Sequence, residues 1–101
     1  EREPFVKDLE SHFVPQNDFR ATYSIAIEGF KNPLTISVVN DKLDVQYGKL
    51  DEVDVYAKIS IDNMQSIVDG RMTFQRAFMT GEMTAKGNFK TLRMLDQIFL
   101  F

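Results

Sequence analysis

Residues 54–99 read DVYAKISIDNMQSIVDGRMTFQRAFMTGEMTAKGNFKTLRMLDQIF, and within this stretch the spacing of the apolar residues changes three times. Alternating apolar and polar residues at its start predict a strand. Apolar residues at helical spacing then predict two short helices, at 62–70 and 73–81. Residues 82–86 alternate again, and residues 88–99 return to helical spacing. The stretch therefore predicts the order strand, helix, helix, strand, helix.

Local signals mark the ends of the two short helices. Asp62 and Gln65 are spaced as a capping pair before the apolar residues of the first helix, and Gly70 ends it. Thr73 is a suitable N-cap for the second helix, and Gly81 ends it.

The residues before this stretch predict one more helix and three more strands. Apolar residues at helical spacing predict a helix at 4–13, and alternation predicts strands at 19–28, 34–38 and 43–47. The strand at the start of residues 54–99 begins one residue earlier and is predicted over 53–61. Because short turns join the strands, we expect them to form an antiparallel meander. The whole chain is then an α+β domain whose helices cover one face of an antiparallel five-stranded sheet.

The alternation also predicts which side chains face the helices. Four are expected to face the helices: Ile25, Ile36, Val45 and Ile59. Four are expected to face water: Thr22, Ser37, Gln46 and Lys58.

Length and composition limit the possible functions. With 101 residues, 44% of them apolar, the chain is expected to fold as a single domain, residues 1–101. A net charge of −3 disfavours nucleic acid as a partner. It also disfavours a strong attraction to anionic lipid surfaces, although a local basic patch can still give transient membrane contact. No apolar run is long enough to span a membrane, so we expect a cytoplasmic domain.

The residue types needed for most catalytic centres are scarce. The sequence has no cysteine, and its one histidine is His12. Neither a nucleophilic triad nor a metal site built on histidines or cysteines can be assembled from these residues. We therefore expect a protein that is not an enzyme and carries no cofactor.

Residues 54–99 resemble the sterol carrier protein type 2 family. The residues that carry the resemblance follow one another in the order of that family: Asp62, Gly70, Ala77-Phe78-Met79, Gly81, Lys86-Gly87 and Leu92. Members of this family carry fatty acids, fatty acyl-coenzyme A, sterols or phospholipids in an apolar tunnel. The resemblance implies a lipid ligand held between the sheet and the C-terminal helices.

The resemblance places the ligand among methionine and phenylalanine side chains of the C-terminal half, since flexible thioethers adapt to ligands of varied shape. The candidate ligand-binding residues are Met64, Phe74, Phe78, Met79, Met83, Phe89, Leu92, Leu95 and Phe99. The alternative is that all of them are ordinary core residues. Lys86, Lys90 and Arg93 are candidates to meet a lipid head group, and the alternative for them is solvation.

The helix at 88–99 is apolar over a wider arc than one sheet face requires, so we expect it to form a wall and a movable gate of the cavity, with Gly87 as its hinge. A second function remains open. In that case the domain belongs to a larger enzyme or complex, and its apolar groove receives a partner helix or the enzyme's apolar substrate.

Overall fold

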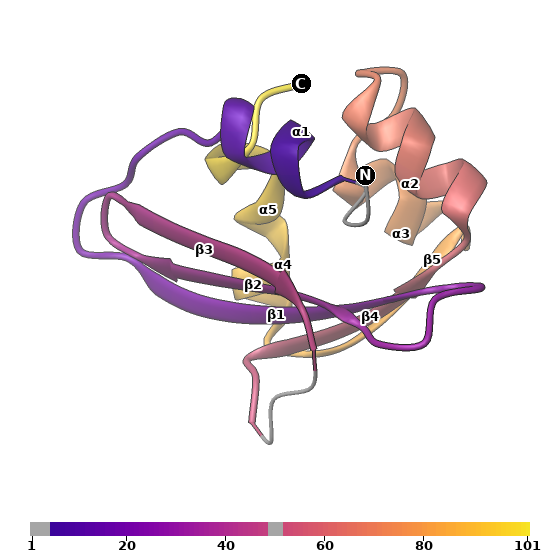
Figure 1. Cartoon of the computed structure of the whole chain (residues 1–101), viewed down its shortest axis with the longest axis horizontal. Coiled ribbons are helices and arrows are strands. Elements are labelled where there is room, and N and C mark those ends of the chain that lie inside the picture. The colour runs from indigo at the N-terminus through magenta and orange to yellow at the C-terminus, as the bar shows by residue number, and fades with distance from the viewer. Residues whose placement is uncertain (1–4, 49–51) are drawn as a thin grey trace.

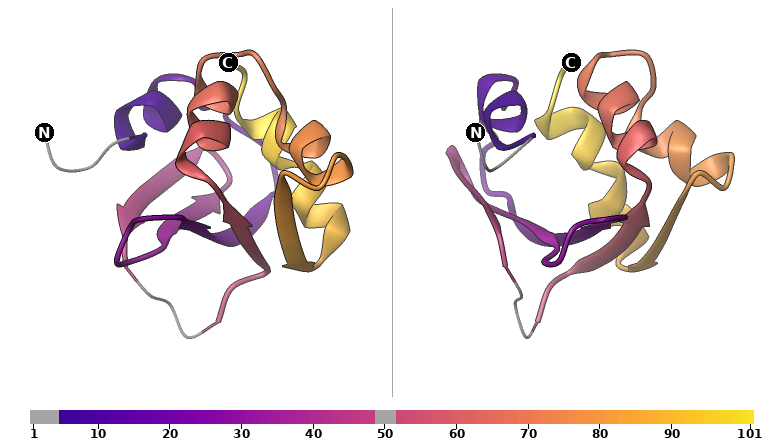
Figure 2. Two further views of the ribbon diagram at one scale, coloured as in Figure 1. Left: turned by 90° about the vertical axis from the view of Figure 1, so that its right-hand side faces the viewer. Right: turned by 45° about the vertical axis from the view of Figure 1, so that its right-hand side comes forward.

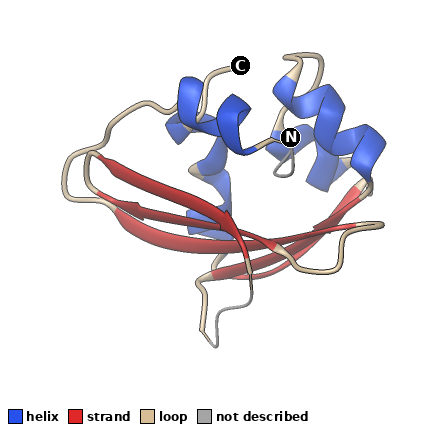
Figure 3. Ribbon diagram, viewed as in Figure 1, coloured by secondary structure: helices blue, strands red, loops and turns tan. Residues whose placement is uncertain are grey.

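The computed structural model describes residues 5–48 and 52–101. Its elements follow the chain in this order: α1 (Val6–Ser11), β1 (Arg20–Ile27), β2 (Leu34–Val39), β3 (Lys42–Tyr47), β4 (Val55–Ile59), α2 (Ile61–Val68), α3 (Phe74–Met79), β5 (Met83–Gly87), α4 (Phe89–Arg93) and α5 (Leu95–Ile98). The helices lie on one face of a single twisted sheet, as the sequence predicts (Figures 1 and 3).

The strand order corrects one prediction. The order is β3-β2-β1-β4-β5, so β4 pairs with β1 and not with its predecessor β3. This pairing is parallel, whereas the other three are antiparallel. The sheet is therefore mixed, and the expected meander of four strands stops after β3.

Hydrogen bonds at the start of β4 fix its place beside β1. The backbone N–H of Thr22 donates to Asp54 Oδ2 at 3.0 Å, and the N–H of Asp54 donates to the Thr22 carbonyl at 3.0 Å. These bonds join positions 32 residues apart, and no local sequence pattern records such a pairing.

The predicted orientation of the sheet is confirmed. All four side chains expected to face the helices are buried: Ile25, Ile36, Val45 and Ile59. The four expected to face water are half-buried or exposed: Thr22, Ser37, Gln46 and Lys58. In the observed register Ile36 pairs with both Tyr23 and Val45, which places these three side chains on the inner face.

The N-cap of α2 differs from the predicted one. The hydroxyl of Ser60 accepts a hydrogen bond from the N–H of Asn63 at 3.2 Å, so Ser60 and not Asp62 is the N-cap of α2. Strand β4 accordingly ends at Ile59, and Ile61 is the first helical residue.

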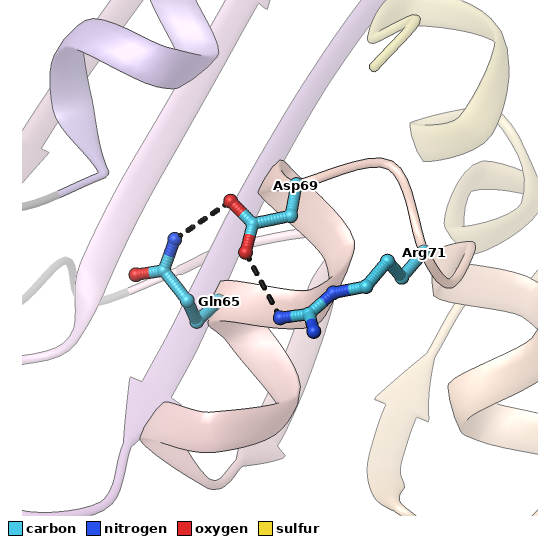
Figure 4. Close-up of polar contacts among 3 residues, drawn as sticks. All are labelled: Gln65, Asp69 and Arg71. Atoms are coloured by element: carbon cyan, nitrogen blue, oxygen red, sulfur yellow. Dashed lines mark hydrogen bonds and ion pairs between the residues drawn. The ribbon is translucent and has the colours of Figure 1, made fainter.

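At the C-terminal end of α2, Asp69 Oδ1 accepts from Gln65 at 2.9 Å, and Asp69 Oδ2 pairs with Arg71 at 3.0 Å (Figure 4).

The first helix is shorter than predicted. It spans Val6–Ser11, and Phe5 before it has a left-handed backbone with φ of 74°. The predicted start at Pro4 lies outside the described residues.

The last predicted helix is two helices. It breaks at Met94, whose N–H donates to the Thr91 carbonyl at 3.1 Å in a tightened turn. After the break, α5 buries Leu95 and Ile98 in the core. The segment after it pairs with the residues that follow α1: Phe13 and Phe99 form an antiparallel bridge, and the Val14 N–H donates to the Ile98 carbonyl at 2.7 Å. The wide apolar arc of residues 88–99 is thus divided between two helices, α4 and α5.

Gly87 belongs to the sheet and is not a free hinge. It pairs with Val55 in β5, with φ of 117°. A Cβ atom at this position would clash with the carbonyl oxygen of Asp54, so this close approach of the backbone requires glycine.

None of the helices in residues 5–48 and 52–101 is long and apolar enough to cross a membrane.

Candidate functional site

An open apolar groove lies between α3 and α4. These two helices pack beside each other, next to β5 (Figure 2). The groove has a volume of about 460 Å3, within the range of small-molecule sites in proteins. Its lining residues define what we call the helix groove: Gln75, Phe78, Met79, Phe89, Leu92 and Arg93.

Large apolar side chains of the helix groove remain in contact with solvent. Met79 is 73% exposed and Phe89 is 52% exposed. Phe78 lies against Phe89 with the ring centroids 5.5 Å apart, and Leu92 is buried beneath them. The groove therefore offers apolar surface that folding has not consumed, as a binding site for an apolar ligand requires.

The N-terminus of α3 is held by two side chains. The hydroxyl of Thr73 accepts from the N–H of Arg76 at 3.0 Å, which confirms the predicted cap. The carboxylate of Asp96, in α5, accepts from the N–H groups of Phe74 and Gln75, each at 2.8 Å. Asp96 thus links α5 to α3, which forms one wall of the groove. The other wall is α4, which directly precedes α5 in the chain.

Hydrogen bonds hold α4 near both of its ends. Asn88 Oδ1 accepts from the N–H of Lys90 at 3.0 Å, and the N–H of Asn88 donates to the Asp54 carbonyl at 3.1 Å. Toward the other end, the buried Tyr23 hydroxyl donates to the Thr91 carbonyl at 2.7 Å. Burial raises the pKa of this hydroxyl well above its usual range, and the charge of Asp54 raises it further.

Of the nine candidate ligand-binding residues, four come together in the helix groove: Phe78, Met79, Phe89 and Leu92. The other five are buried in the core beneath it: Met64, Phe74, Met83, Leu95 and Phe99. Spacing alone does not separate the two sets, because both occupy apolar positions of short helices and strands. The separation follows from how α3 and α4 pack on the sheet.

Two polar groups of the groove, Gln75 and Arg93, were not among those nine residues. The sequence predicts Arg93 only as a head-group candidate, together with Lys86 and Lys90. Lys86 lies elsewhere, on the outer face of the sheet, where it lines a different hollow.

That second hollow, of about 550 Å3, is larger than the helix groove. The sequence does not predict this hollow. Its lining includes the small side chains of Ser24 and Ala26 on the outer face of the sheet. Lysines 31, 58 and 86 border it. We favour the helix groove as the candidate site because Met79 and Phe89 are among the most exposed large apolar residues of the described chain.

Within the described residues no group of three or more histidine, aspartate or glutamate side chains is arranged to hold a metal ion. The lining of the helix groove offers mainly apolar contact, together with the guanidinium of Arg93 and the amide of Gln75.

The solved structures with the same fold include two groups. One is the stereoselective inverting sec-alkylsulfatase Pisa1 from Pseudomonas sp., with a TM-score of 0.67 and 17% identity over 97% of this chain. The present chain spans only 13–14% of the length of the two Pisa1 chains it matches. The similarity to Pisa1 therefore concerns one part of a much longer protein.

The other group consists of small sterol carrier proteins. Palmitated SCP2L2 from Aedes aegypti has a TM-score of 0.64 and 17% identity, covering 82% of this chain and 75% of that one. Apo sterol carrier protein 2 from Yarrowia lipolytica has a TM-score of 0.55 and 28% identity, covering 76% of this chain and 62% of that one. A comparison with curated protein sequences gave no match.

A model of the SCP-2 sterol transfer family, a family of lipid-binding domains, matches residues 16–100. This match covers all five strands and the four helices α2 to α5. The chain therefore belongs to the SCP-2 sterol transfer family.

Proposed function

We propose that this domain binds the alkyl chain of a lipid in the helix groove and carries the lipid without catalysing a reaction on it. The observation that carries the proposal is the exposure of Met79 and Phe89 over the buried Leu92. Removing apolar surface from water lowers the free energy by about 25 cal/mol per Å2. An acyl chain that lies along these side chains is therefore stabilised by the same hydrophobic effect that stabilises a protein core.

The core beneath the groove offers a route to deeper burial. Leu92 both lines the helix groove and belongs to the buried core, which also contains Phe74 and Met83. We propose that an outward shift of α4 admits the end of the chain between these side chains and the sheet. The unbranched side chain of Met83 can then change rotamer to fit different chain lengths.

Relatives support an acyl ligand in particular. The Aedes aegypti protein SCP2L2 with the same fold was solved in a palmitated form. A fatty acid or a fatty acyl-coenzyme A is therefore the ligand class that we propose to test first.

The test is a titration of the protein with a fluorescent fatty acid, compared between wild type and Phe78→Asp. We expect saturable binding in the micromolar range or tighter to the wild type, and clear weakening in the variant because a carboxylate then lies against Phe89. Ile61→Asp is the matched control, since Ile61 is an exposed apolar helix residue outside the helix groove. Thermal unfolding of all three proteins separates lost binding from lost folding.

The absence of saturable binding to the wild type would rule out the carrier function. Equal weakening by Phe78→Asp and Ile61→Asp would place the lipid outside the helix groove. Native mass spectrometry of the purified protein, followed by solvent extraction, then identifies any lipid that it retains.

A second candidate function is supported by the match to part of Pisa1, a much longer chain. In this case the domain is a module of a larger enzyme, and the helix groove receives that enzyme's apolar substrate. To test this function, the intact polypeptide that contains this sequence is isolated from its source cells and its mass is measured. A chain several times longer than 101 residues that carries a catalytic domain is the expected result.

A further inference from the structure

The outward sides of α3 and α4 are neighbours, because the two helices pack beside each other. On α3 the buried residues are Phe74 and Ala77, so the helix turns Gln75, Arg76 and Met79 outward. On α4 the buried residue is Leu92, so this helix turns Phe89, Lys90 and Arg93 outward. We call these six outward residues the α3–α4 face: Gln75, Arg76, Met79, Phe89, Lys90 and Arg93.

This face combines exposed apolar groups with cations. Two of its side chains are large and apolar, and three are positively charged, while neither helix contains an acidic residue. In the described part of the chain the only ion pair joins Arg71 and Asp69, so the three cations of the face are not neutralised by a salt bridge.

The acidic groups nearest in sequence to these two helices are already engaged. Asp96 accepts the two backbone N–H groups at the start of α3, and Glu82 accepts from the Thr80 hydroxyl at 2.8 Å. Since α3 and α4 themselves carry three cations and no carboxylate, the α3–α4 face is locally cationic, although the protein carries a net charge of −3.

We propose that the α3–α4 face docks the protein on an anionic lipid membrane. Phe89 and Met79 insert at the level of the head groups, and Arg76, Lys90 and Arg93 meet the lipid phosphates. Apolar side chains beside lysine and arginine are the combination by which helices lie in the plane of a membrane interface. Charge complementarity selects an anionic surface over a neutral one.

This docking surface extends the proposed function, because it presents the helix groove to the membrane from which a lipid is taken. Met79, Phe89 and Arg93 belong both to the α3–α4 face and to the lining of the helix groove. A lipid can then pass between membrane and groove without crossing water. Arg76 and Lys90 belong to the face alone, which allows docking and ligand binding to be tested separately.

The test is co-sedimentation with vesicles of phosphatidylcholine alone and with vesicles of equal parts phosphatidylcholine and phosphatidylglycerol. We expect binding to the anionic vesicles only, weakening as salt is added because salt screens the exposed charges. The double variant Arg76→Gln/Lys90→Gln is expected to reduce this binding by about tenfold or more. Lys31→Gln/Lys42→Gln is the matched control, since it removes the same charge from two exposed positions on other elements and is expected to bind like the wild type.

Titration with the soluble fluorescent fatty acid distinguishes the two proposals. If Arg76→Gln/Lys90→Gln binds the fatty acid normally but loses the vesicles, both proposals stand. If the wild type binds the fatty acid but no vesicle, or if both double variants lose vesicle binding equally, the docking surface is wrong and the proposed function survives. If the wild type binds anionic vesicles but not the fatty acid, the docking surface stands and the carrier function fails.

Discussion

The carboxylate of Asp96 accepts a hydrogen bond from the backbone N–H of Phe74, with 2.8 Å between Asp96 Oδ1 and the nitrogen. Its second oxygen accepts from the next N–H along the chain, that of Gln75. A side chain of α5 thus satisfies two of the N–H groups that have no partner within α3. The orientation of α3, and with it the wall of the helix groove, depends on this contact.

Asp96→Asn is expected to lower the free energy of unfolding by about 1–2 kcal/mol, because the amide keeps one acceptor oxygen and loses the charge that strengthens both bonds. Urea unfolding measures the change. Asp44→Asn is the control, since Asp44 is an exposed residue of β3. An equal effect of the two substitutions would mean that the Asp96 contact does not stabilise α3.

Tyr23→Phe is expected to cost about 1 kcal/mol at neutral pH, because the Thr91 carbonyl loses the hydroxyl that donates to it. The variant should also change the pH dependence. In the unfolded chain the tyrosine releases its proton near pH 10, whereas burial in the folded protein raises its pKa well above that value. Unfolding therefore releases a proton above about pH 10, and the stability of the wild type declines there as the pH rises.

Unfolding of wild type and Tyr23→Phe at a series of pH values from neutral to alkaline checks this prediction. The stability difference between the two proteins should shrink above about pH 10. A difference that stays constant over the whole series would contradict a raised pKa for Tyr23.

Gly87→Ala is expected to destabilise the protein by about 2–4 kcal/mol, because the new methyl group would clash with the Asp54 carbonyl and φ is positive. Gly29→Ala separates these two causes. Gly29 also has a positive φ, of 89°, but a methyl group added there would meet no atom within 4 Å beyond its chain neighbours. A cost of only about 1 kcal/mol is therefore expected there, and similar costs at both sites would show that the close approach of Asp54 is unimportant.

A bound lipid is expected to slow amide hydrogen exchange in α4 more than in β4. The amides of β4 are already protected, since this strand lies between β1 and β5 in the sheet. Exchange measured with and without a fatty acid checks the proposal that α4 shifts to admit the chain. Equal changes in both elements, or none in either, would contradict it.

The sequence predicted several features of this fold correctly because their signals are local. Alternation placed Ile36 and Val45 on the buried face of the sheet, and Thr73 was recognised as the cap of α3. Each of these features depends on residues within a few positions of one another. The resemblance of residues 54–99 likewise indicated the SCP-2 sterol transfer family, which the family model confirms.

The features that define the candidate site were decided by contacts between distant residues. Strand β4 pairs with β1 through bonds such as that between Thr22 and Asp54, 32 positions apart. The expected single helix breaks at Met94, after which Asp96 reaches the start of α3. Alternation and helical spacing record which side chains are buried, but not which strand or helix they are buried against. Tertiary packing alone therefore left Met79 and Phe89 at the surface and enclosed Phe74 and Met83 in the core.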